Sequence, residues 1–119
     1  MTRAVAVALA FAAVALAGFG GASSSATLRV KLDDKMTLRP IEGYVWFVGL
    51  DGKTHAVRGS ATTLLRGTAG RHLLTSFIRT CDGNCGYLDP PSHRCTLRLR
   101  LPARATVRLR NAGCRITVG

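Results

Sequence analysis

The stretch Cys95–Arg110, "CTLRLRLPARATVRLR", decides the fold because apolar and polar residues alternate along it on both sides of one proline. Alternation is typical of β-strands, whose successive side chains point to opposite faces. Pro102 marks the turn between two such strands. A loop of residues 102–104 places leucines on one face and arginines on the other, whereas a two-residue loop would set core leucines opposite polar residues. The sequence therefore predicts a β-hairpin with one apolar face and one arginine face.

The arginine face of this predicted hairpin is the first candidate binding site, because the register sets Arg98 opposite Arg108. Like charges directly opposite each other destabilise a strand pair, and an anion bound between them would relieve the repulsion by accepting bidentate hydrogen bonds. The alternative is a solvated outer face whose charges only block edge aggregation. The predicted anion-binding set is Arg98, Arg100, Arg108 and Arg110.

The rest of the chain is also predicted to form strands and turns. After the first residues, the apolar residues do not recur with the period of a helix. The remaining strand-like segments are TLRVKL (27–32), YVWFVGL (44–50), THAVRG (54–59), RHLLTSFIRT (71–80) and CRITV (114–118). The DGK sequence at 51–53 is typical of a hairpin turn, and YVWFVGL, apolar on both faces, is typical of a central strand. SATTLLRGTAG (60–70) is a loop or a short edge strand. Together they predict one all-β domain, an antiparallel, immunoglobulin-like or prealbumin-like β-sandwich of about seven strands.

Residues 1–26 are predicted to be a helical signal peptide that precedes a domain of residues 27–119. Arg3 is followed by an apolar run over residues 4–17, which is too short to span a bilayer and long enough for the core of a secretory leader. Cleavage after Ala26 is favoured over cleavage after Ala17, because strand-like sequence begins at residue 27. An uncleaved membrane anchor is the alternative. The protein is therefore expected to be secreted or held at the cell envelope, with no membrane span after cleavage.

Four cysteines, Cys81, Cys85, Cys95 and Cys114, all lie in the predicted exported domain and predict two disulfides. The favoured pairing is Cys85–Cys95 with Cys81–Cys114, and the main alternative is Cys81–Cys85 with Cys95–Cys114. A zinc site built with His93 is disfavoured because export oxidises thiols and because Cys114 would lack a partner. The spacing also does not match a thioredoxin-like redox motif. No metal and no cofactor is therefore expected.

The cysteine-rich loop "RTCDGNCGYLDPPSHRC" (79–95) is a second candidate site. Tyr87 and Leu88 are apolar residues in a turn-rich segment stiffened by disulfides and two prolines. A rigid loop with an aromatic tip loses little entropy on binding, which favours recognition of a partner protein. The alternative is that Tyr87 folds back to cap the core.

The chain is strongly basic, with 17 Lys and Arg against 6 Asp and Glu and a formal net charge of +11. This charge favours anionic envelope polymers, lipid head groups or acidic proteins as partners, although biased codon usage in a GC-rich genome would also give a basic composition. Nucleic acid is not an expected partner of an exported protein. Because nucleophile turns, glycine-rich phosphate loops and paired carboxylates are all missing, the sequence predicts neither an enzyme nor a small-molecule substrate.

Two resemblances add to this interpretation. The segments GLDGKTHAV (49–57) and RGTAGRHLLTSFIR (66–79) are similar to the pattern of carboxypeptidase-regulatory-like, or prealbumin-like, seven-stranded sandwiches. His72 stands where that pattern has a tyrosine, and the matching residues are Gly43, Asp51, Gly52 and Gly70. The run CDGNCGYLDPPSHRC (81–95) resembles a segment of small secreted proteins of high-GC bacteria. These resemblances imply a small exported sandwich that serves as a binding or structural module, not a particular activity.

Overall fold

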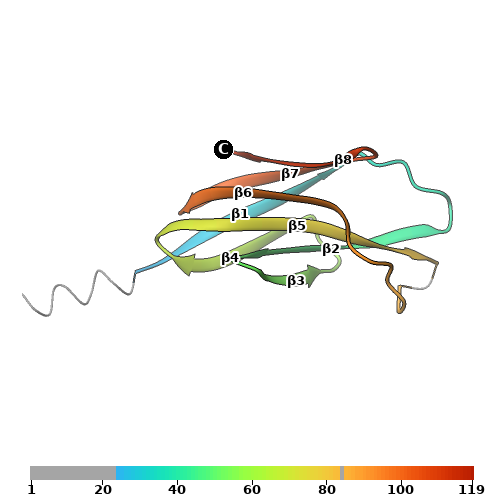
Figure 1. Ribbon diagram of the computed structural model, residues 1–119, viewed down its shortest axis with the longest axis horizontal. Helices are drawn as coiled ribbons and strands as arrows, with labels where there is room; N and C mark the ends of the chain where they lie inside the picture. The colour runs from blue at the N-terminus through green and yellow to red at the C-terminus, as the bar shows by residue number, and fades with distance from the viewer. Residues whose placement is uncertain (1–23, 84) are drawn as a thin grey trace, which may run out of the picture.

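The computed structural model describes residues 24–83 and 85–119, which form two four-stranded β-sheets with no helix in these ranges (Figure 1). The strands are β1 (Ser25–Asp34), β2 (Glu42–Leu50), β3 (Lys53–Val57), β4 (Thr62–Thr68), β5 (Gly70–Asp82), β6 (Ser92–Leu101), β7 (Ala103–Arg110) and β8 (Gly113–Val118). The predicted signal helix lies mostly outside the described residues. The prediction of an all-β fold is confirmed for the described part of the chain.

Each sheet combines strands from both halves of the sequence (Figure 1). Sheet A has the order β4-β1-β7-β8, and sheet B has the order β3-β2-β5-β6. Within the described ranges there are eight strands rather than about seven, because the segment predicted as a loop or edge strand forms β4, at the edge of sheet A. The pairing of β1 with β7 is parallel, so the prediction of a wholly antiparallel sandwich is wrong for this pair.

One hydrophobic core fills the space between the sheets. Alternate residues of each inner strand point into it, as the two-residue period of a strand requires. Its buried members include Leu28, Val30, Val107 and Leu109 from sheet A and Trp46, Val48, Leu74, Ile78, Leu99 and Leu101 from sheet B. The indole Nε1 of Trp46 donates a hydrogen bond to the Ser76 hydroxyl at 2.9 Å. The two sheets therefore pack in a β-sandwich-like arrangement.

The predicted hairpin over Cys95–Arg110 is wrong, although both of its strands exist. At Pro102 the chain leaves sheet B and enters sheet A, so β6 pairs with β5 and β7 pairs with β1 and β8. The leucine faces of both strands still meet the core, but from opposite sides. Alternation determines which side chains point inward, and a crossover between sheets satisfies it as well as a hairpin does. Arg98 is consequently not opposite Arg108.

The hairpin predicted at Asp51–Lys53 is confirmed. β2 and β3 are antiparallel, with Leu50 opposite Lys53, and the turn residue Asp51 adopts a positive φ of 52°. β2 lies between β3 and β5, which confirms the prediction that the segment with two apolar faces is a central strand. This pairing matters for the sites below because it places Asp51 next to β5.

The first strand begins before the favoured cleavage point. β1 starts at Ser25, and both Ser25 and Ala26 are paired with β4, opposite Thr68 and Gly67. Ala26 also packs against the core. Cleavage after Ala26 would remove these two paired residues, whereas cleavage after Ala17 would keep them. The site of cleavage itself stays a prediction.

Two disulfides are present, as predicted, but the favoured pairing is wrong and the main alternative is correct. The bridges are Cys81–Cys85 and Cys95–Cys114, with Cα atoms 5.1 and 5.6 Å apart. The reason is the crossover at Pro102, which places the edge strands β6 and β8 beside each other along one side of the sandwich. Cys95–Cys114 therefore joins the two sheets, and Cys81–Cys85 closes only the start of the loop. Two disulfides fit an oxidising compartment.

Candidate functional site

The outer face of sheet A carries a broad group of basic side chains, which we call the basic face. Its members come from all four strands: Arg66 from β4, Arg29 and Lys31 from β1, Arg104, Arg108 and Arg110 from β7, and Arg115 from β8. The residues that alternate with them in β1 and β7, such as Val30 and Val107, are fully buried. All of the basic side chains except Arg110 are exposed, so the face is open to solvent.

Within the basic face, cations stand directly opposite one another on neighbouring strands. Arg29 is the register partner of Arg104 in the parallel β1–β7 pair, and Arg108 is the partner of Arg115 in the antiparallel β7–β8 pair. Among the described residues, these four side chains form no hydrogen bond or ion pair. Like charges at opposed positions repel each other. A bound anion is the partner that would turn this repulsion into attraction.

Among the residues that the structure describes, Asp33 is the one acidic side chain on the basic face, and Arg110 neutralises it. The Arg110 guanidinium donates to the Asp33 carboxylate at 3.1 Å and to the Asp33 carbonyl at 3.0 Å. The hydrogen bond from Arg110 is the largest cause of the lowered pKa of the Asp33 carboxyl. Arg110 is thus committed to Asp33, whereas Arg108 and Arg115 remain available to a ligand.

The turn of the β7–β8 hairpin, whose strands carry Arg108 and Arg115, is held in place by other segments. The side-chain oxygen of Asn111 accepts a hydrogen bond from the backbone N–H of Thr37 at 2.8 Å, and its carbonyl lies 3.2 Å from Nε2 of His93. The Cys95–Cys114 disulfide fixes the start of β8 to β6. A surface held in this way loses little conformational entropy when it binds a ligand.

The structure divides the four predicted anion-binding arginines between two opposite faces, so they do not form one site. Arg108 and Arg110 belong to the basic face, while Arg98 and Arg100 project from the outer face of sheet B. On that face Arg100 is opposite Arg71 of β5, and Arg98 is opposite Leu73. The predicted opposed pair of Arg98 with Arg108 does not form; the opposed arginine pairs are Arg71 with Arg100, Arg29 with Arg104, and Arg108 with Arg115.

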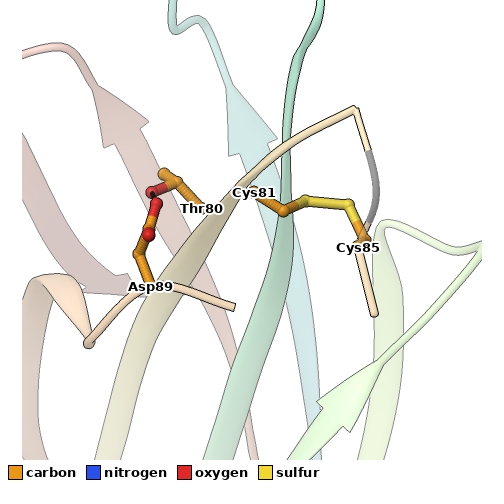
Figure 2. Close-up of a disulfide and its surroundings, with 4 residues drawn as sticks. All are labelled: Thr80, Cys81, Cys85 and Asp89. Carbon is orange, nitrogen blue, oxygen red and sulfur yellow. Dashed lines mark hydrogen bonds between the residues drawn. A yellow bond between two sulfur atoms is a disulfide. The ribbon is translucent and has the colours of Figure 1, made fainter. Parts of the chain in front are cut away.

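The cysteine-rich loop is tied to the end of β5 on both sides of that strand (Figure 2). Thr80 donates its hydroxyl proton to the Asp89 carboxylate at 2.8 Å, and the Asp89 N–H donates to the Thr80 carbonyl at 2.8 Å. The Arg79 guanidinium donates to the carbonyls of Leu88 and Asp89 at 3.1 and 2.8 Å. With Cys81–Cys85, these contacts hold the base of the loop rigidly.

Tyr87 does not fold back onto the core. Its exposed fraction is 87%, the largest among the exposed large apolar residues, while Leu88 is half-buried. Ile41, in the neighbouring β1–β2 connection, is also exposed, at 70%. The backbone of this connection approaches the loop, because a Cβ placed on Gly83 would lie 3.8 Å from the Ile41 carbonyl oxygen. The exposed tyrosine on a tied loop leaves the second candidate site open as a contact surface.

A histidine clamp joins the β2–β3 turn and the end of β4 to β5, at the opposite end of the sandwich. Nδ1 of His72 lies 2.5 Å from the Asp51 carboxylate, and Nε2 lies 2.7 Å from the Thr68 carbonyl oxygen. The second carboxylate oxygen of Asp51 accepts the Leu73 N–H at 3.0 Å. Both ring nitrogens face acceptors, so the protonated imidazole donates two hydrogen bonds here. The sequence did not predict this contact, because only the pairing of β2 with β5 places Asp51 beside Leu73.

The clamp makes stability depend on pH. The hydrogen bonds to Asp51 and then to Thr68 raise the pKa of His72 above 6.5, and those from Leu73 and then His72 lower the pKa of Asp51 below 3.8. The His72 contribution is complete below pH 6.5 and is lost as pH rises through the raised pKa. The Asp51 contribution is present above pH 3.8 and is lost as pH falls through the lowered pKa.

We therefore expect the free energy of unfolding to fall as pH rises above 6.5, and His72→Gln to remove most of this fall. Denaturant unfolding at several pH values measures the effect. His55→Gln is the matched control, because His55 is exposed and makes no side-chain hydrogen bond within the described residues. Retention of the full pH dependence by His72→Gln would contradict the assignment.

The described residues hold no group of three or more His, Cys, Asp or Glu side chains placed to bind a metal ion. They also contain no helix that is long and apolar enough to cross a membrane. No protein-family model, curated protein or solved structure matches the chain.

Sequence reasoning missed most of the basic face. Arg29 and Lys31 lie in the segment predicted as a strand over residues 27–32 but were not assigned to a site, and Arg104 was assigned to the loop of residues 102–104. The available signal was the alternation itself, which places basic residues on the outward side of β1, β7 and β8. It does not show that these three strands are neighbours.

Proposed function

We propose that the protein is an exported, non-enzymatic binding module of the cell envelope, and that it holds anionic polymers on the outer face of sheet A. The observation that carries this proposal is the presence of two pairs of opposed cations, Arg29 with Arg104 and Arg108 with Arg115, on one open face. Within the described part of the chain, Asp33 is the only acid on that face, and Arg110 already neutralises it. Sulfate, phosphate or carboxylate groups of a chain would accept bidentate hydrogen bonds from these guanidinium groups.

The distribution of acidic residues supports the same face. All six acidic residues lie in the described part of the chain, and five of them do not lie on the outer face of either sheet. Four of these five gather at the end that carries the cysteine-rich loop: Asp34, Glu42, Asp82 and Asp89. An anionic polymer is therefore attracted to the outer faces of the sheets rather than to the end that carries the cysteine-rich loop.

The test is binding to dextran sulfate, with neutral dextran as the control polymer. We expect Arg108→Gln with Arg115→Gln to weaken binding roughly tenfold at low salt and to make its salt dependence shallower. The charge-matched control is Arg39→Gln with Arg58→Gln, which removes two exposed arginines from the β1–β2 and β3–β4 connections, outside both sheets. Equal loss in both variants would mean that binding follows net charge and not this face, and equal binding to neutral dextran would exclude an electrostatic interaction.

A second candidate function is capture of a partner protein by the cysteine-rich loop. It is favoured by the 87% exposed fraction of Tyr87 on a loop that Arg79, Thr80 and a disulfide tie to β5. Aromatic side chains on rigid supports are frequent anchors of protein interfaces. Tyr87→Ala would then abolish capture of an envelope protein without changing the affinity for dextran sulfate. Unchanged capture would rule this function out.

We also propose that the sandwich is of the prealbumin-like type. The residues behind the resemblance occupy positions that support it: Asp51 and Gly52 form the β2–β3 turn, and Gly70 begins β5. Gly70 has a φ of 116°, a conformation that side chains rarely adopt, which accounts for glycine at that position. Prealbumin-like domains generally serve as adhesive, packing or carrier modules, which agrees with a binding role.

A further inference from the structure

We propose that one molecule bridges two anionic polymer chains, one on the basic face and one on a second cationic cluster on the outer face of sheet B. This second cluster, which we call the sheet B cluster, is Arg71, Arg98 and Arg100. The inference rests on the proposed function, because it requires that the protein binds anionic polymers at all. It adds a second site and a cross-linking role.

The sheet B cluster repeats the chemistry of the basic face. Arg71 of β5 and Arg100 of β6 are register partners, so two guanidinium groups again stand on opposed positions. Arg98 lies two residues from Arg100 on the same side of β6, at a separation of about 7 Å. All three side chains are exposed, and within residues 24–83 and 85–119 none of them forms an ion pair or a hydrogen bond.

The surface between these arginines is hollowed. A depression of about 360 Å³ is lined by Arg71, Arg98, Leu99 and Arg100. A comparable depression of about 350 Å³ on the other side of the molecule is lined by Arg108, Arg110 and Arg115 together with the β7–β8 turn. Each hollow offers several guanidinium donors to one group, and a sulfate or phosphate group has three or more oxygens that can accept from them.

The two clusters face away from each other. Arg100 precedes and Arg104 follows the crossover at Pro102, where the chain passes from sheet B to sheet A. The core residues Leu99 and Val107 lie between the two faces. Packed sheets are about 10 Å apart, and the side chains that point outward extend this separation further. A short chain segment lying flat on one face therefore cannot contact the other, which leaves the second face free for another chain.

The faces are unequal, and this sets an order of binding. The basic face carries cations from four strands, whereas the sheet B cluster carries them from β5 and β6 only. The first chain is therefore held on the basic face, and the weaker sheet B cluster engages a second chain when polymer is abundant. Two sites on one rigid body give bridging without oligomerisation.

A two-layer capture experiment tests the inference. Beads that carry dextran sulfate are loaded with the protein, washed, and then offered fluorescent dextran sulfate or fluorescent neutral dextran. We expect the loaded beads to retain the fluorescent dextran sulfate and not the neutral polymer. The triple variant Arg71→Gln, Arg98→Gln and Arg100→Gln should load the beads to within about twofold of the wild type and should lose most of the second-layer signal.

The outcomes separate the two proposals. If the wild type does not load the beads, the proposed function fails. If it loads them but never retains the second polymer, the bridging inference fails while the proposed function stands. If the triple variant retains the second polymer as well as the wild type does, the sheet B cluster is not the second site, and the inference is overturned. Thermal unfolding of each variant confirms that these exposed substitutions leave the fold intact.

Discussion

Reducing the Cys95–Cys114 bridge lowers the free energy of unfolding by about 3 kcal/mol, because cross-linking a loop of this length removes that much chain entropy from the unfolded state. The bridge joins residues 19 positions apart and connects the edge strands of the two sheets. Cys81–Cys85 joins residues only 4 positions apart, so its reduction costs less, about 2 kcal/mol. The longer bridge is therefore the more important covalent contribution to stability.

Two single-bridge variants measure each contribution separately. Cys81→Ala with Cys85→Ala retains only Cys95–Cys114, and the converse variant retains only Cys81–Cys85. Denaturant unfolding of each variant, oxidised and reduced, compares identical residues with and without one bridge. A thiol count tests the connectivity as well, because the first variant has no free thiol if Cys95 pairs with Cys114. Two free thiols in that variant, or an equal cost for both bridges, would contradict the assignment.

Gly49→Ala lowers the free energy of unfolding by about 3 kcal/mol, at the upper end of the usual cost of overpacking. A Cβ at this position would overlap the carbonyl oxygen of Lys53 and lie 2.6 Å from Cα of Thr54. Both atoms belong to the backbone of β3, which cannot move aside as a flexible side chain does. The β2–β3 hairpin must therefore shift, and with it the turn that holds Asp51.

Gly43→Ala is the matched control, because Gly43 lies in the same strand. A Cβ there would meet only the Sγ atoms of Cys81 and Cys85, both at 3.6 Å, which is ordinary van der Waals contact. We expect this variant to stay within about 0.5 kcal/mol of the wild type in denaturant unfolding. Equal destabilisation by the two substitutions would show that loss of glycine from β2, rather than the close approach of β3 to Gly49, causes the effect.

The sequence predicted the strands well and their partners poorly. Every segment identified by alternation forms a strand, and the DGK turn joins β2 to β3 as expected. A turn between adjacent strands was also expected at Pro102, where the chain instead crosses between sheets. A two-residue turn sequence specifies a hairpin through its own backbone geometry, whereas an isolated proline only ends a strand.

For the candidate sites too, the sequence predicted the local features correctly and the spatial neighbours incorrectly. Arg98, Arg100, Arg108 and Arg110 do point outward, as predicted, but they lie on two faces. The cysteines were predicted to form two disulfides, but the favoured pairing was wrong, because the crossover places Cys95 of β6 beside Cys114 of β8. The His72 clamp was not predicted at all, since Asp51 reaches that ring only through the pairing of β2 with β5.

The sequence by itself determined which residues form strands and which side chains face the core, because a strand's two-residue period is a local property of the backbone. It also determined that arginines cover the outside. Only the tertiary structure decided which strands are neighbours. The same leucines can be buried in the core whether their strand belongs to one sheet or to the other. The crossover at Pro102 thereby places β7 between β1 and β8 and gives the molecule two opposite cationic faces in place of one arginine ladder.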